Sequence, residues 1–349
     1  MRKVFVILIL VAIVIFSGCT KKEQPVGNEE KPVVAKKEET NVSAPTTEEK
    51  IPKLSPLMQV SAGKDPDLSE YSGKLYIAYE RFTGETDDIH VSTYTSGKIS
   101  KPEKVVETNL NDLAPSLQEY SGNLYLFWTQ DTPPRGRYAD VQFKFLSGNI
   151  WSAKQRADEL DSFFYYHNQS GIVFNKKLLM FWTSGRPGER GKIGTQYYTG
   201  EGWFIGIPVS IENVNEKDAK VTISDNTVHI IYESYAPNAN SNEIYYKSYT
   251  DKGFWTGGVK LSEDLQTDFK SVGDIVSFNG KLYALWVADG DIYLSILEGA
   301  RWNAPIKLTS DSIPQGEPVI EEFNGELYVA YSQMEENNAP FVYLANLEV

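Results

Sequence analysis

Short apolar runs recur along the chain at intervals of about 50 residues, a spacing typical of repeat folds. The runs are rich in β-branched and aromatic residues, contain no proline and are too short for helices, so they predict buried β-strands. Most of them follow a tight turn with Gly or Asn, residues that adopt the positive φ angles of hairpins. The six runs are LYIAYE (75–80), LYLFWT (124–129), LLMFWT (178–183), VHIIYE (228–233), LYALWV (282–287) and LYVAYS (327–332).

Three further strands accompany each run. One precedes the hairpin turn, and another, such as DIHVSTY or EIYYKSY, follows a variable loop. A short turn then leads to a fourth strand, and in four copies a tryptophan closes this turn: Trp151, Trp203, Trp255 and Trp302. Four antiparallel strands in each of six copies predict an all-β protein, a six-bladed β-propeller with four-stranded antiparallel blades.

The two ends of the repeated region predict how the ring closes. The last copy stops at its third strand, FVYLANLEV (341–349), and an extra strand, LSPLMQVSA (54–62), precedes the first copy. We expect the N-terminal strand to join the last blade as its missing outer strand, because closure removes the exposed edges of an open array. The predicted propeller domain spans 55–349.

The first 19 residues have the composition of an export signal. Arg2 and Lys3 precede a run of thirteen apolar residues, which is shorter than the roughly 20 residues of a membrane span. The segment ends in Ser17-Gly18-Cys19 and resembles the lipobox of prokaryotic lipoproteins, although Phe16 replaces the usual Leu. That resemblance implies an extracytoplasmic protein held to the membrane by a lipid on Cys19. The alternative is an uncleaved signal anchor with a free thiol.

Residues 20–54 predict a disordered, charged tether. The segment contains seven Lys, seven Glu and four Pro but no aromatic residue, so it cannot bury enough apolar surface to offset the entropy of ordering. The whole chain carries a net charge of −13. Because the signal adds two positive charges and the tether is neutral, the propeller carries −15. This charge argues against nucleic acid as a partner.

The repeat unit, a strand pair followed by a Gly turn and Trp, resembles the sialidase-like propellers that carry Asp-boxes and their non-catalytic lectin relatives. The resemblance covers 55–349 as a loose pattern, and the Asp-box itself is degenerate: YTDKGFW (249–255) keeps Asp251, Gly253 and Trp255 but is one residue short. It implies a six-bladed ring and leaves the activity open, since fold does not determine function.

Five of the seven arginines of the predicted propeller lie in the loops between the second and third strands of the first three blades: Arg81, Arg135, Arg137, Arg186 and Arg190. Guanidinium groups bind carboxylates and phosphates with two parallel hydrogen bonds, so these side chains are candidates for a ligand site on the variable-loop face. The alternative is that they pair with acidic residues nearby. Tyr166, in the aromatic run SFFYYHN (162–168), is a further candidate because sugars stack on aromatic rings; alternatively, part of this run is the first strand of the third blade.

A sialidase would need an arginine trio, a Tyr–Glu nucleophile pair and an Asp acid/base. Glu233, Tyr235 and Asp65 are the candidates, but no Phe/Tyr-Arg-Ile-Pro motif is present. Acids recur before the third strand (Asp88, Asp140, Glu243, Asp291) and at the start of the first (Asp65, Asp218, Glu317). This repetition favours a structural role, with the side chains accepting hydrogen bonds from loop N–H groups, over a Ca²⁺ site. No metal site and no cofactor are predicted.

These patterns favour a monomeric, surface-anchored lipoprotein whose propeller binds a glycan or a surface protein through the variable-loop face. One alternative is a glycoside hydrolase of sialidase type, which needs carboxyl groups converging at the channel mouth. Another is a structural lipoprotein that docks other envelope proteins, which needs an exposed apolar patch.

Overall fold

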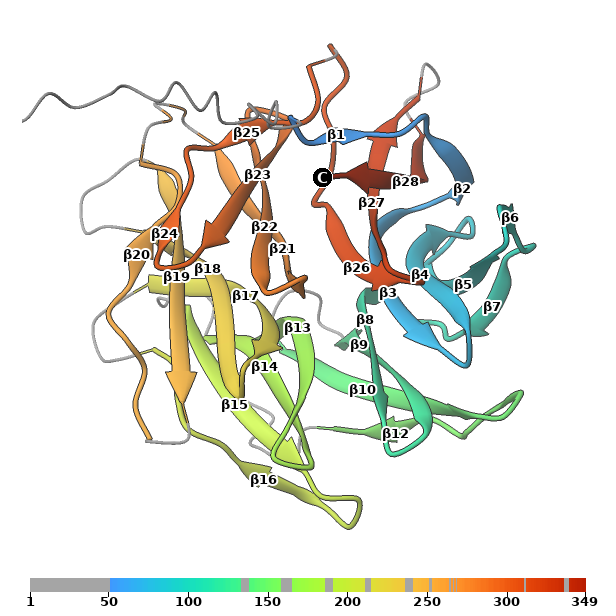
Figure 1. The fold of residues 1–349 in the computed structure, drawn as a ribbon. Coiled ribbons are helices and arrows are strands. Elements are labelled where there is room, and N and C mark those ends of the chain that lie inside the picture. The colour runs from blue at the N-terminus through green and yellow to red at the C-terminus, as the bar shows by residue number, and fades with distance from the viewer. Residues whose placement is uncertain are drawn as a thin grey trace, which may run out of the picture. The chain divides into compact units, whose positions relative to one another are not determined.

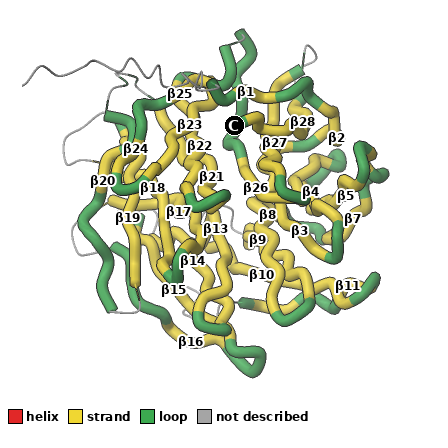
Figure 2. Tube along the Cα trace, viewed as in Figure 1, coloured by secondary structure: helices red, strands yellow, loops and turns green. Residues whose placement is uncertain are grey.

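The computed structural model describes residues 51–132, 138–157, 165–185, 191–210, 215–235, 241–250, 253–263, 265, 267, 269–310, 312–335 and 339–349. These residues form strands and turns without a helix (Figure 2), and therefore no helix among them could span a bilayer. The strands are arranged as six blades around a central channel (Figure 1), which confirms the predicted six-bladed β-propeller.

The blades follow the chain in order, each running from the channel outward. Blade one contains β3 (Lys64–Tyr71), β4 (Lys74–Phe82), β5 (Asp87–Thr95), β6 (Lys98–Ile99) and β7 (Glu103–Val106). Blade two contains β8 (Asp112–Tyr120), β9 (Asn123–Thr132), β10 (Tyr138–Ser147), β11 (Ile150–Trp151) and β12 (Gln155–Arg156). Blade three contains β13 (Tyr165–Phe174), β14 (Lys177–Gly185), β15 (Lys192–Tyr198) and β16 (Trp203–Ile205).

The second half of the ring repeats this order. Blade four contains β17 (Asn215–Ser224), β18 (Thr227–Tyr235), β19 (Asn242–Thr250) and β20 (Val259–Lys260). Blade five contains β21 (Lys270–Phe278), β22 (Lys281–Ala288), β23 (Asp291–Glu298), β24 (Arg301–Trp302) and β25 (Ile306–Lys307). Blade six contains β26 (Val319–Phe323), β27 (Glu326–Met334) and β28 (Pro340–Glu348), completed by β2 (Met58–Ala62) and β1 (Lys53–Leu54).

Both ends of the chain therefore meet in blade six, as predicted. The register runs from Lys53 opposite Glu348 to Ala62 opposite Phe341. Strand pairing begins at Lys53 in β1, two residues before the predicted domain boundary at 55. The prediction of a lipid on Cys19 lies outside the described residues.

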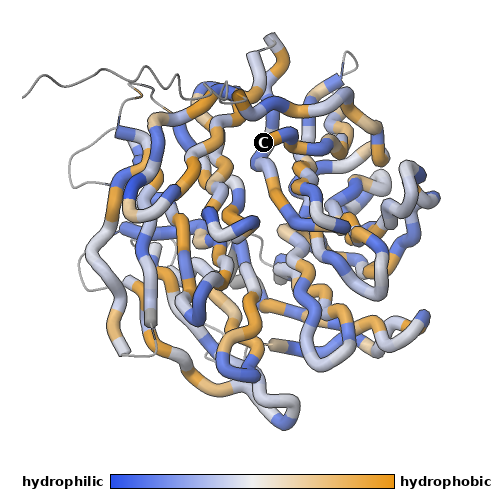
Figure 3. The backbone as a smooth tube through the Cα atoms, viewed as in Figure 1, coloured by the Kyte–Doolittle hydropathy of each residue, from blue (hydrophilic) through white to orange (hydrophobic). Residues whose placement is uncertain are grey.

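Six apolar clusters form the core, and each fills the interface between two neighbouring blades. Apolar segments accordingly follow the strands around the ring (Figure 3). Packing explains why a tryptophan recurs near the fourth strand. In each case its ring packs into the interface with the preceding blade, as seen for Trp151, Trp203, Trp255 and Trp302. The hairpin turns have the expected geometry: Asn279 and Gly280, for example, have φ angles of 49° and 72°.

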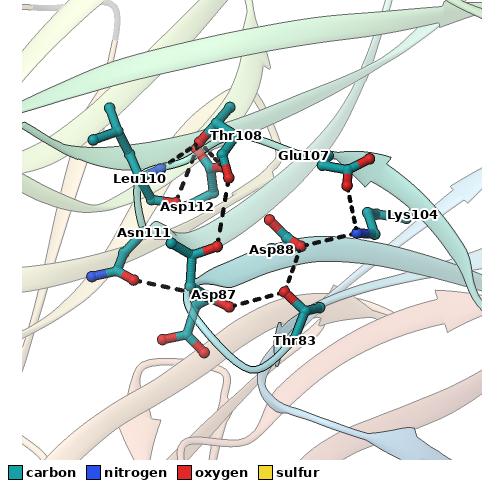
Figure 4. Close-up of polar contacts among 10 residues, drawn as sticks. Thr83, Asp87, Asp88, Lys104, Glu107, Thr108, Leu110, Asn111 and Asp112 are labelled. Atoms are coloured by element: carbon teal, nitrogen blue, oxygen red, sulfur yellow. Dashed lines mark hydrogen bonds and ion pairs between the residues drawn. The ribbon is translucent and has the colours of Figure 1, made fainter.

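The acids at the start of the third strands form ion pairs within their own blades, each with a basic residue of the outer strand. In blade one, Lys104 on the outer strand lies 3.3 Å from Asp88, and Thr83 donates a hydrogen bond to the same carboxylate (Figure 4). The equivalent pairs are Asp140–Arg156, Glu243–Lys260 and Asp291–Lys307, at 3.0, 3.0 and 2.7 Å. The recurring partner is thus a basic side chain of the outer strand rather than the loop N–H groups that we expected.

Candidate ligand-binding site

The first strand of each blade lines the central channel, and an irregularity near its start shapes the channel mouth. In β3, β8, β13 and β17 the register shifts and an extra residue takes a positive φ angle: Asp65, Ala114, Asn168 and Asp218. A β-bulge of this kind turns side chains away from the regular pleat. The bulges surround a cavity of about 370 Å³ on the variable-loop face.

A Lys–Asp–Glu cluster from blade one borders this cavity. Lys64 Nζ lies 2.8 Å from Glu80 Oε2 and 3.6 Å from Asp65 Oδ2. Glu80 is buried at the end of β4, and its other oxygen accepts a hydrogen bond of 2.5 Å from the N–H of Ala114 in blade two. Burial, assisted by the charge of Asp65, raises the pKa of Glu80 to about 8 even though Lys64 opposes the increase.

Blade four repeats the cluster on the opposite side of the ring. Lys217 Nζ lies 2.9 Å from Asp218 and 3.1 Å from Glu233, which is buried at the end of β18. Glu233 accepts hydrogen bonds from Asn242 Nδ2 at 2.7 Å and from the N–H of Val272 in blade five at 3.3 Å. Burial and the charge of Asp218 raise the pKa of Glu233.

Glu317, just before β26, faces the cavity between the two clusters. No hydrogen bond or ion pair joins it to another residue that the structure describes. Burial, assisted by the charges of Asp218 and Asp65, raises the pKa of Glu317 to about 8 against the charge of Lys220. A carboxyl group whose pKa is raised in this way is suited to donate a hydrogen bond or a proton.

A second layer of ionisable groups lies deeper in the channel, around a smaller cavity of about 80 Å³. Burial raises the pKa of Asp67 to about 7 and that of Asp274 to about 6, in both cases against the charge of Lys220. Burial also raises the pKa of Glu321 to about 8. Burial lowers the pKa of Lys220, but the charges of Asp67 and Asp274 outweigh this effect and the net change is an increase. In this layer the positive charge of the Lys220 ammonium group therefore lies close to several buried carboxyl groups.

Of the candidates taken from the sequence, Asp65 lines the cavity and Glu233 lies in the blade-four cluster. The ring centroid of Tyr235 is 5.6 Å from Lys217 Nζ, so this tyrosine borders the same cluster. The side chains of these three residues thus come from blades one and four, while Glu80, Asp218 and Glu317 complete the group. Glu80 and Glu233 could have been singled out because only the first and fourth runs, LYIAYE and VHIIYE, end in Glu.

The arginine prediction falls mostly outside the described residues. Arg135, Arg137, Arg186 and Arg190 lie there entirely, and Tyr166 is placed only by its backbone, which pairs with Ser184 in β14. Arg81 is partly exposed at the end of β4, opposite Asp88 in the ladder, and no ion pair joins it to another described residue. The run that contains Tyr166 is in part the first strand of blade three, as the second interpretation of SFFYYHN expected.

No metal centre is apparent in the part of the chain that the structure describes, since no group of three or more His, Cys, Asp and Glu side chains is arranged to hold an ion. The two clusters instead consist of carboxyl groups paired with lysines. Together with Glu317 between them, the clusters offer a ligand several carboxyl groups, and the pKa values of Glu80 and Glu317 are raised to about 8.

Searches with the sequence found no matching family model and no matching curated protein. The fold, in contrast, is similar to solved structures. A protein of unknown function from Dyadobacter fermentans superimposes with a TM-score of 0.67 at 11% identity, over 86% of this chain and 98% of that one. An α-L-arabinanase from Penicillium chrysogenum, complexed with arabinobiose, gives 0.63 at 14% identity, over 84% and 98%.

Sialidase from Trypanosoma rangeli, in complex with sialic acid, gives a TM-score of 0.62 at 11% identity. The match covers 82% of this chain but only 54% of the sialidase chain. The resemblance to sialidase-like propellers is therefore confirmed for the fold, and at such identities it shows the fold alone.

Proposed function

We propose that this protein binds a glycan at the channel mouth, and that the ligand is neutral or carries an ammonium group. The observation that carries the proposal is the cavity of about 370 Å³, which Asp65, Glu80, Asp218 and Glu317 line together with Lys64 and Lys220. Its volume falls in the range of about 300–1,000 Å³ that small-molecule sites occupy. Carboxylates accept hydrogen bonds from sugar hydroxyl groups, and bonds to charged groups are the stronger ones.

The charge of the site disfavours an acidic sugar. Four carboxyl groups line the cavity against two lysines, and the propeller as a whole carries −15. A sialic acid carboxylate would be repelled by Asp65 and Asp218 at the cavity and by the net negative charge of the propeller. The charge thus supports a neutral glycan or an amino sugar over a sialoside.

Hydrolysis of the bound glycan is a second candidate function, and Glu317 is the observation that favours it. Glycoside hydrolases pair a protonated carboxylic acid with an ionised carboxylate on the other side of the scissile bond. Glu317 has the raised pKa of a proton donor, and Asp65 and Asp218 are the neighbouring carboxylates. Glu233 is less suited to attack a sugar, because Asn242, Val272 and Lys217 already engage its oxygens. The solved structures with this fold include a sialidase and an arabinanase.

We further propose that the protein acts outside the cytoplasm, attached to a membrane through a lipid on Cys19. The support is the signal pattern of the first 19 residues, which ends in the only cysteine of the chain. Docking of other envelope proteins remains the alternative role for such a surface propeller.

A glycan array tests the proposed ligand class. Neutral and amino glycans should give signals, whereas sialylated glycans with the same core should not. Signals confined to sialylated or sulfated glycans would overturn the proposal and favour the predicted arginine site.

Hydrolysis is tested on the glycans that bind. Glu317→Gln should retain binding and lose hydrolysis, because an amide cannot donate the proton. Binding without release of sugar by the unmodified protein would leave a lectin-like module.

A further inference from the structure

An apolar groove of about 290 Å³ lies between the outer parts of blades three and four. Its walls include Phe181, Tyr197, Ile205, Ile207 and Trp255. Ile205 and Ile207 are 71% and 50% exposed, although residues of this kind are usually buried. The groove extends to the hairpin turn at Asn175, so it lies toward the face opposite the channel mouth.

Further apolar side chains protrude from turns on the same face. In an antiparallel blade, the turn between strands one and two and the turn between strands three and four lie at the same end. Ile150, the first residue of β11 in blade two, and Phe254 of blade four directly follow the second of these turns and are 77% and 66% exposed. Phe204, in β16 of blade three, is 49% exposed. Together with Ile205 and Ile207, these residues form an apolar rim over three consecutive blades.

The polar groups of this rim are balanced in charge. Lys176 and Lys177 are exposed at the edge of the groove, and Glu201 and Asp225 are exposed in neighbouring turns. Among these described residues, the two lysines therefore offset the two carboxyl groups. Trp255 Nε1 is buried and has no hydrogen-bond acceptor among the described residues.

We propose that the apolar rim (Ile150, Phe204, Ile205, Ile207 and Phe254) rests on the surface of a lipid bilayer. Apolar side chains beside turns and on an exposed outer strand can enter the boundary between headgroups and acyl chains. The channel mouth on the opposite face then points away from the membrane, toward a ligand in solution. This contact goes beyond the proposed function and does not require that a glycan is the ligand.

The N-terminal sequence explains why such a contact is useful. The 31 residues between Cys19 and Ile51 reach at most ~100 Å when extended. A lipid on Cys19 therefore holds the propeller near the bilayer without fixing which face is turned toward it. The rim fixes this orientation. Because the net charge of the propeller is negative, apolar insertion rather than attraction to anionic headgroups supplies the binding.

Vesicle binding tests the proposal without the lipid anchor. The chain lacking residues 1–19 retains every described residue, and its co-sedimentation with phosphatidylcholine vesicles is measured. Ile205→Ser combined with Phe254→Ser should lower the partition coefficient about tenfold, since two partly inserted side chains are lost. The matched control is Phe82→Ser with Met334→Ser, two side chains that are 65% and 42% exposed at the mouth face. This control should bind vesicles as the unmodified chain does.

Three results would overturn the proposal: no binding to vesicles at millimolar lipid, equal loss in both double variants, or binding that appears only with phosphatidylglycerol and disappears in salt. Light scattering measures the molar mass in solution and so tests whether a second copy of the chain covers the rim instead of a bilayer. If the unmodified chain forms a dimer that Ile205→Ser and Phe254→Ser dissociate, a second copy covers the rim. Unchanged thermal unfolding of the variants excludes misfolding as the cause of a loss.

Discussion

Glu80 and Glu233 occupy the same position in blades one and four, and each accepts a hydrogen bond from the backbone of the following blade, at Ala114 and Val272 respectively. Each also pairs with a lysine from the bulge of its own first strand, Lys64 or Lys217. The channel mouth thus has an approximate two-fold arrangement that links blade one to two and blade four to five.

Glu80 should therefore stabilise the ring as well as line the cavity. Glu80→Ala leaves the ammonium group of Lys64 and the N–H of Ala114 without their main acceptor, and we expect a loss of about 2–4 kcal/mol in the free energy of unfolding. Urea denaturation measures this loss. The control Glu298→Ala, in an exposed pair with Lys281, should change the free energy by less than ~0.5 kcal/mol. Equal effects of the two substitutions would show that the bond between the blades is unimportant.

Closure of the ring is tested by two truncations. Removing residues 1–50 leaves all strands in place, so the thermal midpoint should not change. Removing residues 1–62 deletes β1 and β2, whose Leu54, Met58 and Val60 pack against the core clusters of blade six. This truncation should cost about 3–5 kcal/mol from the apolar burial lost. Calorimetry of both forms is the measurement, and matching midpoints would contradict the closure.

The buried acids of the channel predict that stability falls as the pH rises. The folded state holds a proton on Asp67 up to a pKa of about 7, whereas the unfolded chain releases it near the ordinary aspartate pKa of 3.8. Unfolding thus releases a proton in this window, and the free energy of unfolding decreases from about pH 4 to pH 7. Asp67→Asn should reduce this decrease by on the order of 2 kcal/mol between pH 5 and pH 7. Asp289→Asn, at an exposed turn, is the control, and urea titrations at several pH values with identical slopes for all three proteins would refute the assignment.

Repetition made the fold readable from the sequence, while the site depended on the closed ring. Hairpins such as that of Asn279 and Gly280 form from residues that are neighbours in the sequence. Six similar copies of such a hairpin therefore predict six blades. Asp65 and Asp218, in contrast, are far apart in the chain and meet only because blades one and four face each other across the channel. The sequence places each at the start of a first strand, but the bulge that turns its side chain into the cavity leaves no simple sequence signature. The sequence instead favours the arginines as ligand-site candidates, because they cluster in loops.

The proposed anchoring depends on Cys19, the only cysteine of the chain. Cys19→Ser should release the protein from the membrane fraction or leave it unprocessed, because the acceptor for the lipid is gone. Fractionation with mass spectrometry of the N-terminus measures both results. If a processed Cys19→Ser protein still partitions into membranes as the unmodified protein does, the lipid is not its anchor, and the apolar rim then becomes the main contact.

The central claim is that the carboxyl-lined mouth binds the ligand, and isothermal titration with the best neutral or amino glycan tests it most directly. Glu317→Ala removes a group that no described residue engages, so it should weaken binding about tenfold, the value of one hydrogen bond to a polar ligand. Glu298→Ala, on the opposite face, should leave the affinity unchanged. The account is contradicted if Glu317→Ala binds as tightly as the unmodified protein while Arg81→Ala or Arg135→Ala abolishes binding, because the ligand would then lie on the arginine loops.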